Sequence, residues 1–108
     1  MSDPLGAVFA ALADPTRREV VETLLREGDT SVPVLTGRLP MTRQAVAKHL
    51  AALDDAGLVE RSAGRGREVR WALRPGALDD AAEWMRDAGA AWDRRLTRLK
   101  ATVERRVD

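Results

Sequence analysis

A short segment at 42–50 carries side chains that are suited to contact a nucleic acid. Arg43, Gln44 and Lys48 offer hydrogen-bonding groups that can reach base edges and phosphates in the major groove of DNA. Ala47 lies on the same face, and its small side chain lets a helix backbone approach closely. The competing interpretation is a solvated helix face, which is what most polar faces are. We treat the segment as a candidate DNA reader, without deciding which residues contact bases and which contact phosphates.

Thr42 precedes this face, and His49, like Arg43, lies at its flank. Thr42 is placed to cap the helix, because a hydroxyl just before the first turn can accept a backbone N–H. His49 is the only histidine of the chain, and a metal site needs several ligands. It is therefore either a donor to phosphate or a residue packed at the helix edge. Both residues join the candidate DNA-binding set.

A second basic group follows in a Gly-Arg-Gly-Arg turn between two strand-like segments. We call the whole segment, about 58–74, the wing. The net charge of the chain is only +1, yet residues 58–75 hold five Arg and two Glu. Arg65 and Arg67, with Arg70 as a further candidate, are suited to hold phosphates or enter the minor groove. The competing interpretation is a solubilising hairpin tip. The glycines beside Arg65 favour DNA binding, because they let the loop follow the DNA backbone.

The composition excludes several other classes of protein. Without cysteine there can be no disulfide, thiolate metal site or cysteine nucleophile. The sequence has no Ser-His-Asp set, phosphate loop or nucleotide motif, so we predict no catalytic residues, no enzyme activity and no cofactor. No apolar run approaches membrane-spanning length and no signal-peptide pattern is visible, which predicts a cytoplasmic protein. We favour surface ion pairs over a metal site for the acids of the last helix, Asp79, Asp80, Glu83, Asp87 and Asp93.

Cap signals and apolar spacing predict four helices before the wing. Asp3 and Asp14, each followed by proline, are typical helix starts. Ser31 is a weaker cap for the third helix. The fourth helix spans about 42–56, and its tight connection to the third predicts a helix-turn-helix. The expected inner faces hold Leu5, Val8, Phe9 and Leu12, then Val20, Val21, Leu24 and Leu25, then Val32, Leu35 and Leu39, then Val46, Leu50 and Leu53.

The last expected helix, about 76–105, carries a heptad repeat of apolar and small residues. Two sets of positions seven apart form one stripe, as in paired helices. A chain of 108 residues cannot cover so long a helix alone, so we predict a second copy as its partner. Trp84 lies off the stripe and is expected in a core, the alternative being the wall of a small-molecule pocket. The stripe consists of Leu78, Met85, Trp92 and Leu99 and, offset by four, of Ala82, Gly89, Leu96 and Val103.

Four segments together resemble the ArsR family of bacterial winged-helix repressors. They are Ala-Leu-Ala-Asp-Pro-Thr-Arg-Arg at 11–18, the helix at 42–50, Asp-Ala-Gly-Leu-Val at 55–59, and the Arg-rich wing. The resemblance covers nearly the whole chain and is specific in combination. It implies a mainly α fold, a single winged helix-turn-helix domain over residues 1–108 with about five helices and a two-stranded hairpin.

The resemblance also implies a homodimer that joins the first and last helices and binds operator DNA near its own promoter. Leu5 and Phe9 would then belong to the dimer interface. Founding members of the family sense metals through Cys-Val-Cys on the third helix, whereas residues 32–37 here are Val-Pro-Val-Leu-Thr-Gly. Others hold zinc through His and Asp on the last helix, which has no His here. The chain resembles the metal-independent branch.

Two functions are open at this point. The first is a sequence-specific, dimeric transcriptional regulator, acting as a repressor on its own or a neighbouring promoter. The second is a winged-helix module for protein interaction. The polar outer face of the helix at 42–56 favours DNA, because an interaction surface would expose apolar or aromatic residues there. The operator, the regulated genes and any small-molecule effector are not specified by the sequence.

Overall fold

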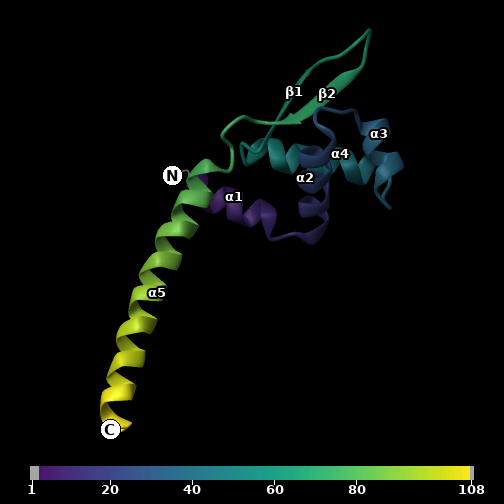
Figure 1. Cartoon of the computed structure of the whole chain (residues 1–108). Helices are drawn as coiled ribbons and strands as arrows, with labels where there is room; N and C mark the ends of the chain where they lie inside the picture. Colours follow the sequence, from purple (N-terminus) through teal and green to yellow (C-terminus); the bar gives the residue numbers. More distant parts are fainter. Residues whose placement is uncertain (1–2, 108) are drawn as a thin grey trace. The chain divides into compact units, whose positions relative to one another are not determined.

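The computed structural model describes residues 3–107 as two compact units, one ending at Leu78 and the other beginning at Asp79. Four helices, a hairpin and a long helix follow one another in these residues, which confirms the predicted winged helix-turn-helix (Figure 1). The elements are α1 (Pro4–Leu12), α2 (Pro15–Glu27), α3 (Val32–Arg38), α4 (Arg43–Asp55), β1 (Val59–Ala63), β2 (Val69–Leu73) and α5 (Asp79–Val107).

The first two helices begin at the predicted Asp-Pro pairs. The Asp3 carboxylate accepts the N–H of Gly6 at 3.0 Å, and the Asp14 carboxylate accepts the N–H of Thr16 at 2.8 Å. Each bond satisfies a donor that the first helical turn leaves without a partner. α2 ends at Gly28, whose φ of 76° favours glycine.

α3 follows Ser31, as expected, but the capping bond is absent and one residue of its expected inner face lies beyond the helix. Ser31 occupies the N-cap position, but its side chain makes no capping hydrogen bond. Leu39 lies outside the helix in an extended conformation, with φ −120° and ψ 144°. The following Pro40 explains this, because proline disfavours the helical conformation of the residue before it. Residues 39–42 thus form the turn between α3 and α4.

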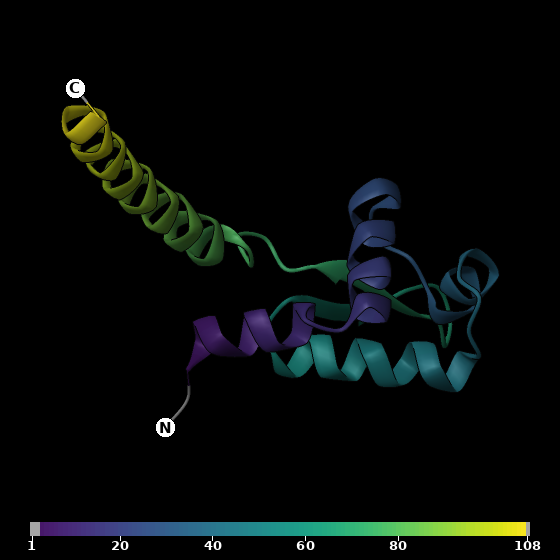
Figure 2. The same ribbon diagram turned by 90° about the horizontal axis from the view of Figure 1, so that it is seen from below.

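The core of the first unit draws on α1 to α4 and the base of the hairpin. α2 passes in front of α4 in Figure 1, and its N-terminal end lies beside α4 in Figure 2. Leu25 was wrongly expected inside and is 60% exposed, since it lies at the edge of the apolar stripe of α2. The side chains with no exposed surface are Val20, Leu35, Val46, Leu50, Leu53, Leu58 and Val59.

The wing is an antiparallel hairpin that is anchored at its base. Val59 pairs with Leu73, and Ala63 pairs with Val69. On the edge of β2 that faces away from β1, Thr30 forms a β-bridge to Trp71 through two backbone hydrogen bonds of 2.9 and 2.7 Å. The connection between α2 and α3 therefore holds one edge of the hairpin, while its tip extends beyond the helices of the first unit (Figure 1).

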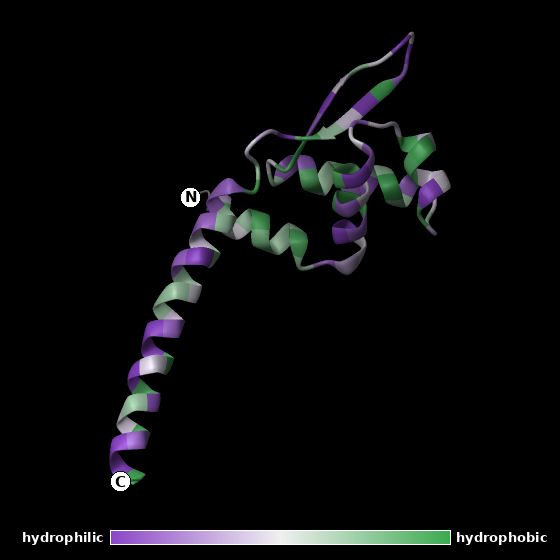
Figure 3. Cartoon of the chain, viewed as in Figure 1, coloured by the Kyte–Doolittle hydropathy of each residue, from purple (hydrophilic) through white to green (hydrophobic). Residues whose placement is uncertain are grey.

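The second unit is the single helix α5 of 29 residues. It begins three residues later than predicted, because Gly76, with φ 73°, lies in a turn that includes Leu78. Leu78 is therefore not the first position of the helical stripe. Trp84 is 53% exposed, so the expected core position is not found within one chain. Hydrophobic and hydrophilic segments alternate along α5 (Figure 3).

Candidate nucleic-acid interface

α4 has one buried side and one exposed side. Its apolar residues Val46, Leu50 and Leu53 have no exposed surface. This packing fixes the rotation of the helix about its own axis. Four of the predicted DNA-contacting residues lie together on the exposed side: Arg43, Gln44, Ala47 and Lys48.

Thr42 adds a hydroxyl at the start of this face. Its Oγ1 accepts the N–H of Ala45 at 3.1 Å, which caps α4. The hydroxyl proton is not used by that bond, because the oxygen acts there as an acceptor. Thr42 is exposed, so the same group can cap the helix and donate to an outside acceptor.

His49 is half-buried at the edge of α4, on the side of the α2 N-terminus. The pKa of the Asp14 carboxyl is lowered, chiefly by the hydrogen bond from the N–H of Thr16. The backbone N–H and charge of Arg17 and the charge of His49 also favour the carboxylate, while partial desolvation opposes them. The two roles considered for His49, packing at the helix edge and donation to phosphate, both stay predictions.

The cations of the first unit fall into two groups. Arg17 and Arg18 donate to carbonyls at the end of α1, at 2.7 Å to Ala11 and 2.7 Å to Leu12, and Arg38 pairs with Glu27 at 2.8 Å. These guanidinium groups stabilise the fold. Among the described residues, the following make no side-chain hydrogen bond or ion pair: Arg43, Lys48, Arg61, Arg65, Arg67 and Arg74.

Arg70 differs from the other wing candidates because its guanidinium has several partners in the structure. Its guanidinium pairs with Glu68 at 3.0 Å and with the Asp29 carboxylate at 3.3 Å, and donates to the Asp29 carbonyl at 2.8 Å. The hydrogen bonds that its guanidinium donates to the carboxylates of Asp29 and then Glu68 raise the pKa of Arg70 above the usual value for arginine. Arg70 thus ties β2 to the segment between α2 and α3.

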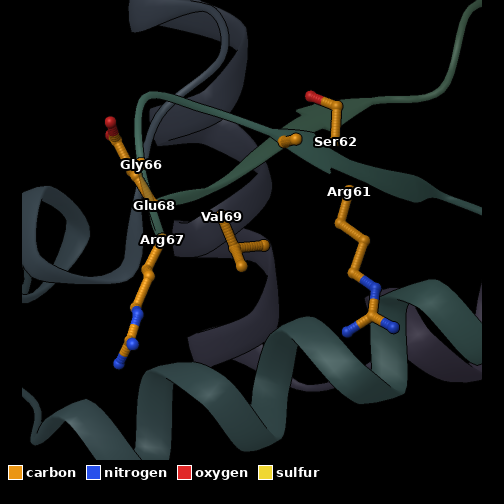
Figure 4. A pocket seen from close by; sticks show the side chains of 7 residues that line it. Arg61, Ser62, Gly66, Arg67, Glu68 and Val69 are labelled. Atoms are coloured by element: carbon orange, nitrogen blue, oxygen red, sulfur yellow. The ribbon is translucent and has the colours of Figure 1, made fainter.

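Arg65 and Arg67 are exposed in the loop between β1 and β2. A hollow of about 390 Å³ opens on the hairpin beside Arg67, and Arg61 of β1 lines it too. Figure 4 shows both guanidinium groups leaving the hairpin on the side where the ribbon of α4 runs. The sequence-based site omitted Arg61. Because side chains alternate between the two faces of a strand, Arg61 could have been placed on the same face as the apolar Val59.

α5 carries an exposed apolar stripe. A side chain at Gly89 would meet nothing within 4 Å, so the backbone is open to close approach there. The proposed interface residues of α1, Leu5 and Phe9, are half-buried, as is Ala82 of α5. The large apolar residues of the stripe are exposed by 52% at Met85, 59% at Trp92, 43% at Leu96, 60% at Leu99 and 53% at Val103.

The charges of α5 are separated along its length. Residues 79–93 hold five acids and one arginine, whereas residues 94–107 hold six cations and one acid. Across the part of the chain that is described, no three acidic or histidine side chains come together as a metal site. None of the helices in residues 3–107 combines the length and apolar character needed to cross a membrane.

Comparison with known proteins places these features among bacterial regulators. A family profile described as a helix-turn-helix domain matches residues 12–62. The HTH-type transcriptional regulator Rv2034 of Mycobacterium tuberculosis is 38% identical over 101 residues, covering 93% of this chain and 89% of the relative. The transcriptional repressor SdpR of Bacillus subtilis is 28% identical, covering 75% and 88%. An ArsR-like transcriptional regulator from Rhodococcus is 46% identical with a TM-score of 0.76, covering 90% of each chain.

Proposed function

The chain belongs to the ArsR family of HTH-type transcriptional regulators, and on that premise we propose that it is a dimeric repressor of operator DNA. DNA binding and transcription regulation follow from membership of the family. The repressor role is supported by one relative, the transcriptional repressor SdpR of Bacillus subtilis. Action on DNA would place the protein in the cytoplasm of a bacterium.

The observation that carries this proposal is the polar face of α4. Arg43, Gln44 and Lys48 are exposed there and have no partner among the described residues. Side chains of these types can read base edges in the major groove, while the exposed Ala47 allows close approach. The same face offers no large apolar side chain, which argues against a module for protein interaction.

The wing supplies the second contact in this proposal. Arg65 and Arg67 would meet the DNA backbone or the minor groove beside the major groove that α4 enters. Contacts of this kind position the protein and contribute most of its salt-dependent affinity. Base contacts by α4 would then determine the sequence that is recognised.

A homodimer would give the two copies of α4 their spacing. The stripe on α5 suits a second α5, because unpaired large apolar groups are costly in water. We propose that the two α5 helices run antiparallel, since the acidic half of one then faces the basic half of the other. The α4 helices would reach successive major grooves, about 34 Å apart.

The test is nuclease protection on the DNA upstream of the protein's own gene. We expect the purified protein to protect an inverted repeat there and to prefer it over a scrambled duplex of equal length. Binding to both duplexes with the same affinity would contradict the operator-specific proposal. Binding to neither would remove the DNA-binding interpretation of α4 altogether.

A further inference from the structure

The face of the wing that carries Arg61 is determined by the strand register. Side chains alternate between the two faces of a strand, so Val59 and Arg61 lie on the same face. Val59 is fully buried, so this face of β1 packs on the core at Val59 and becomes exposed at Arg61. In the strand register Arg61 lies opposite Trp71, whereas Ser62 lies opposite Arg70. Arg61 and Arg70 therefore lie on opposite faces of the hairpin.

The opposite face of the wing carries the carboxylate of Glu68. Glu68 pairs with Arg70 at 3.0 Å. Figure 4 shows the Glu68 carboxylate and the Ser62 hydroxyl on one side of the hairpin, with Arg61 and Arg67 on the other. The positive charge of the Arg61 side is therefore not neutralised by the one acid that lines the hollow.

Arg61 and Arg67 differ from the arginines that stabilise the fold. Among the described residues neither makes a side-chain hydrogen bond or an ion pair, and both are exposed. Both line the same hollow of about 390 Å³. A guanidinium presents several N–H donors in one plane, which suits the oxygens of a phosphate.

We propose that Arg61 is a DNA-contacting residue that acts with Arg67 on backbone phosphate, on the α4 side of the wing. This inference rests on the proposed function and extends it. Arg65, at the loop between the strands, is then left for the minor groove. The wing would contact DNA along β1 as well as at its tip.

The experiment measures affinity over a series of salt concentrations for the full chain on operator and scrambled duplexes. Each lost phosphate contact lowers the slope of log affinity against log salt by about 0.9. Arg61→Gln should therefore lower the slope by about 1.8 for a dimer that binds through both wings. The loss should be the same on both duplexes, because a phosphate contact carries no sequence information.

Two further variants make the result specific. Arg61→Lys keeps the charge and should restore most of the slope. Arg26→Gln removes an equal charge from α2 and should leave the slope near that of the wild type. Unchanged circular dichroism and thermal midpoint in Arg61→Gln would show that the exposed substitution leaves the fold intact.

If Arg61→Gln keeps the salt slope of the wild type, the inference on Arg61 is overturned. The proposed function would still stand if the wild type prefers operator over scrambled DNA. The reverse is also distinguishable. Equal wild-type affinity for operator and scrambled DNA overturns the proposed function, yet a lowered slope in Arg61→Gln would still support a phosphate contact. Absence of any DNA binding by the wild type overturns both.

Discussion

At the residue scale, partnered and unpartnered cations separate the groups that build the fold from those available to DNA. Arg17 and Arg18 cap the end of α1 with hydrogen bonds as short as 2.7 Å. Arg43 and Lys48 have no comparable partner among residues 3–107. A fully hydrogen-bonded guanidinium would have to break native contacts before it could bind phosphate. Within the first unit, the unpartnered groups lie on α4 and the wing, which are the two elements proposed to contact DNA.

The first prediction separates reading from positioning. Gln44→Ala should cost about 1–3 kcal/mol on the operator and little on scrambled DNA, because an amide can bond two groups of one base. Arg65→Ala should weaken binding to both duplexes and reduce the salt dependence. Competition binding on the two duplexes measures both effects. If Gln44→Ala and Lys48→Ala both retain the operator preference, α4 is not the reader.

The second prediction concerns Arg70, which we expect to position the wing without contacting DNA. Asp29→Asn removes one of its acidic partners, and therefore should loosen the wing and weaken DNA binding. A purely electrostatic account predicts the opposite, since losing an acid raises the net charge. Fluorescence anisotropy with labelled operator distinguishes the two. Tighter binding by Asp29→Asn would contradict a positioning role.

At the element scale, the sequence predicted most helices because their ends depend on local chemistry. Asp3, Asp14, Thr42 and Gly28 act within one turn of themselves, so their effects can be read from neighbouring residues. The capping bond of Ser31, the place of Leu39 and the start of α5 were predicted less accurately. Ser31 had cap chemistry, but its hydroxyl makes no capping bond.

The candidate site was predictable to a smaller extent for a related reason. The exposed face of α4 follows from helical spacing alone. The engagement of Arg70 by Asp29 joins residues 41 positions apart, and nothing local to either residue indicates it. Arg61 was also missed, since its face depends on which strand residues are buried. Long-range pairing thus determined which wing arginines remain free.

The third prediction tests the cap of α2 by pH. Because its folded pKa is lowered, the Asp14 carboxylate stabilises the fold above the unfolded value of about 3.9. That contribution is lost as the pH falls through the folded pKa. Asp14→Asn keeps a capping oxygen but does not titrate, so its thermal midpoint should fall less below about pH 4. Circular dichroism melts measure this, with the exposed Asp54→Asn as the control. An identical acid response in Asp14→Asn and wild type would contradict the assignment.

At the scale of the whole molecule, we expect DNA binding to be independent of metal. The chain has no cysteine and one histidine, so it lacks the thiolate and imidazole ligands of the metal-sensing members. Treatment with a chelator should leave operator affinity and thermal midpoint unchanged. Gel-shift titrations before and after chelation provide the measurement. Loss of binding that a single added metal restores would show this prediction to be wrong.

The fifth prediction concerns the assembly of two chains. The exposed stripe of α5 includes Trp92 at its middle, where two antiparallel helices would cross near their centres. Trp92→Glu would bury a carboxylate in that contact, so the variant should sediment as a monomer at micromolar concentration, where the wild type is a dimer. The first unit has its own buried core, so circular dichroism should still detect a folded α1–β2 region. Trp84→Glu, off the stripe, is the matched control and should remain dimeric.

The direction of the helices is tested by charge. Replacing Arg94, Arg95 and Arg98 with Glu puts acids opposite the acidic half of an antiparallel partner, and should weaken the dimer most at low salt. In a parallel pair, wild-type halves of equal sign would already face each other, and the dimer would strengthen as salt rises. Sedimentation equilibrium over a salt series separates these cases. A wild-type monomer throughout the series would remove the dimer and, with it, the proposed spacing of the two α4 helices.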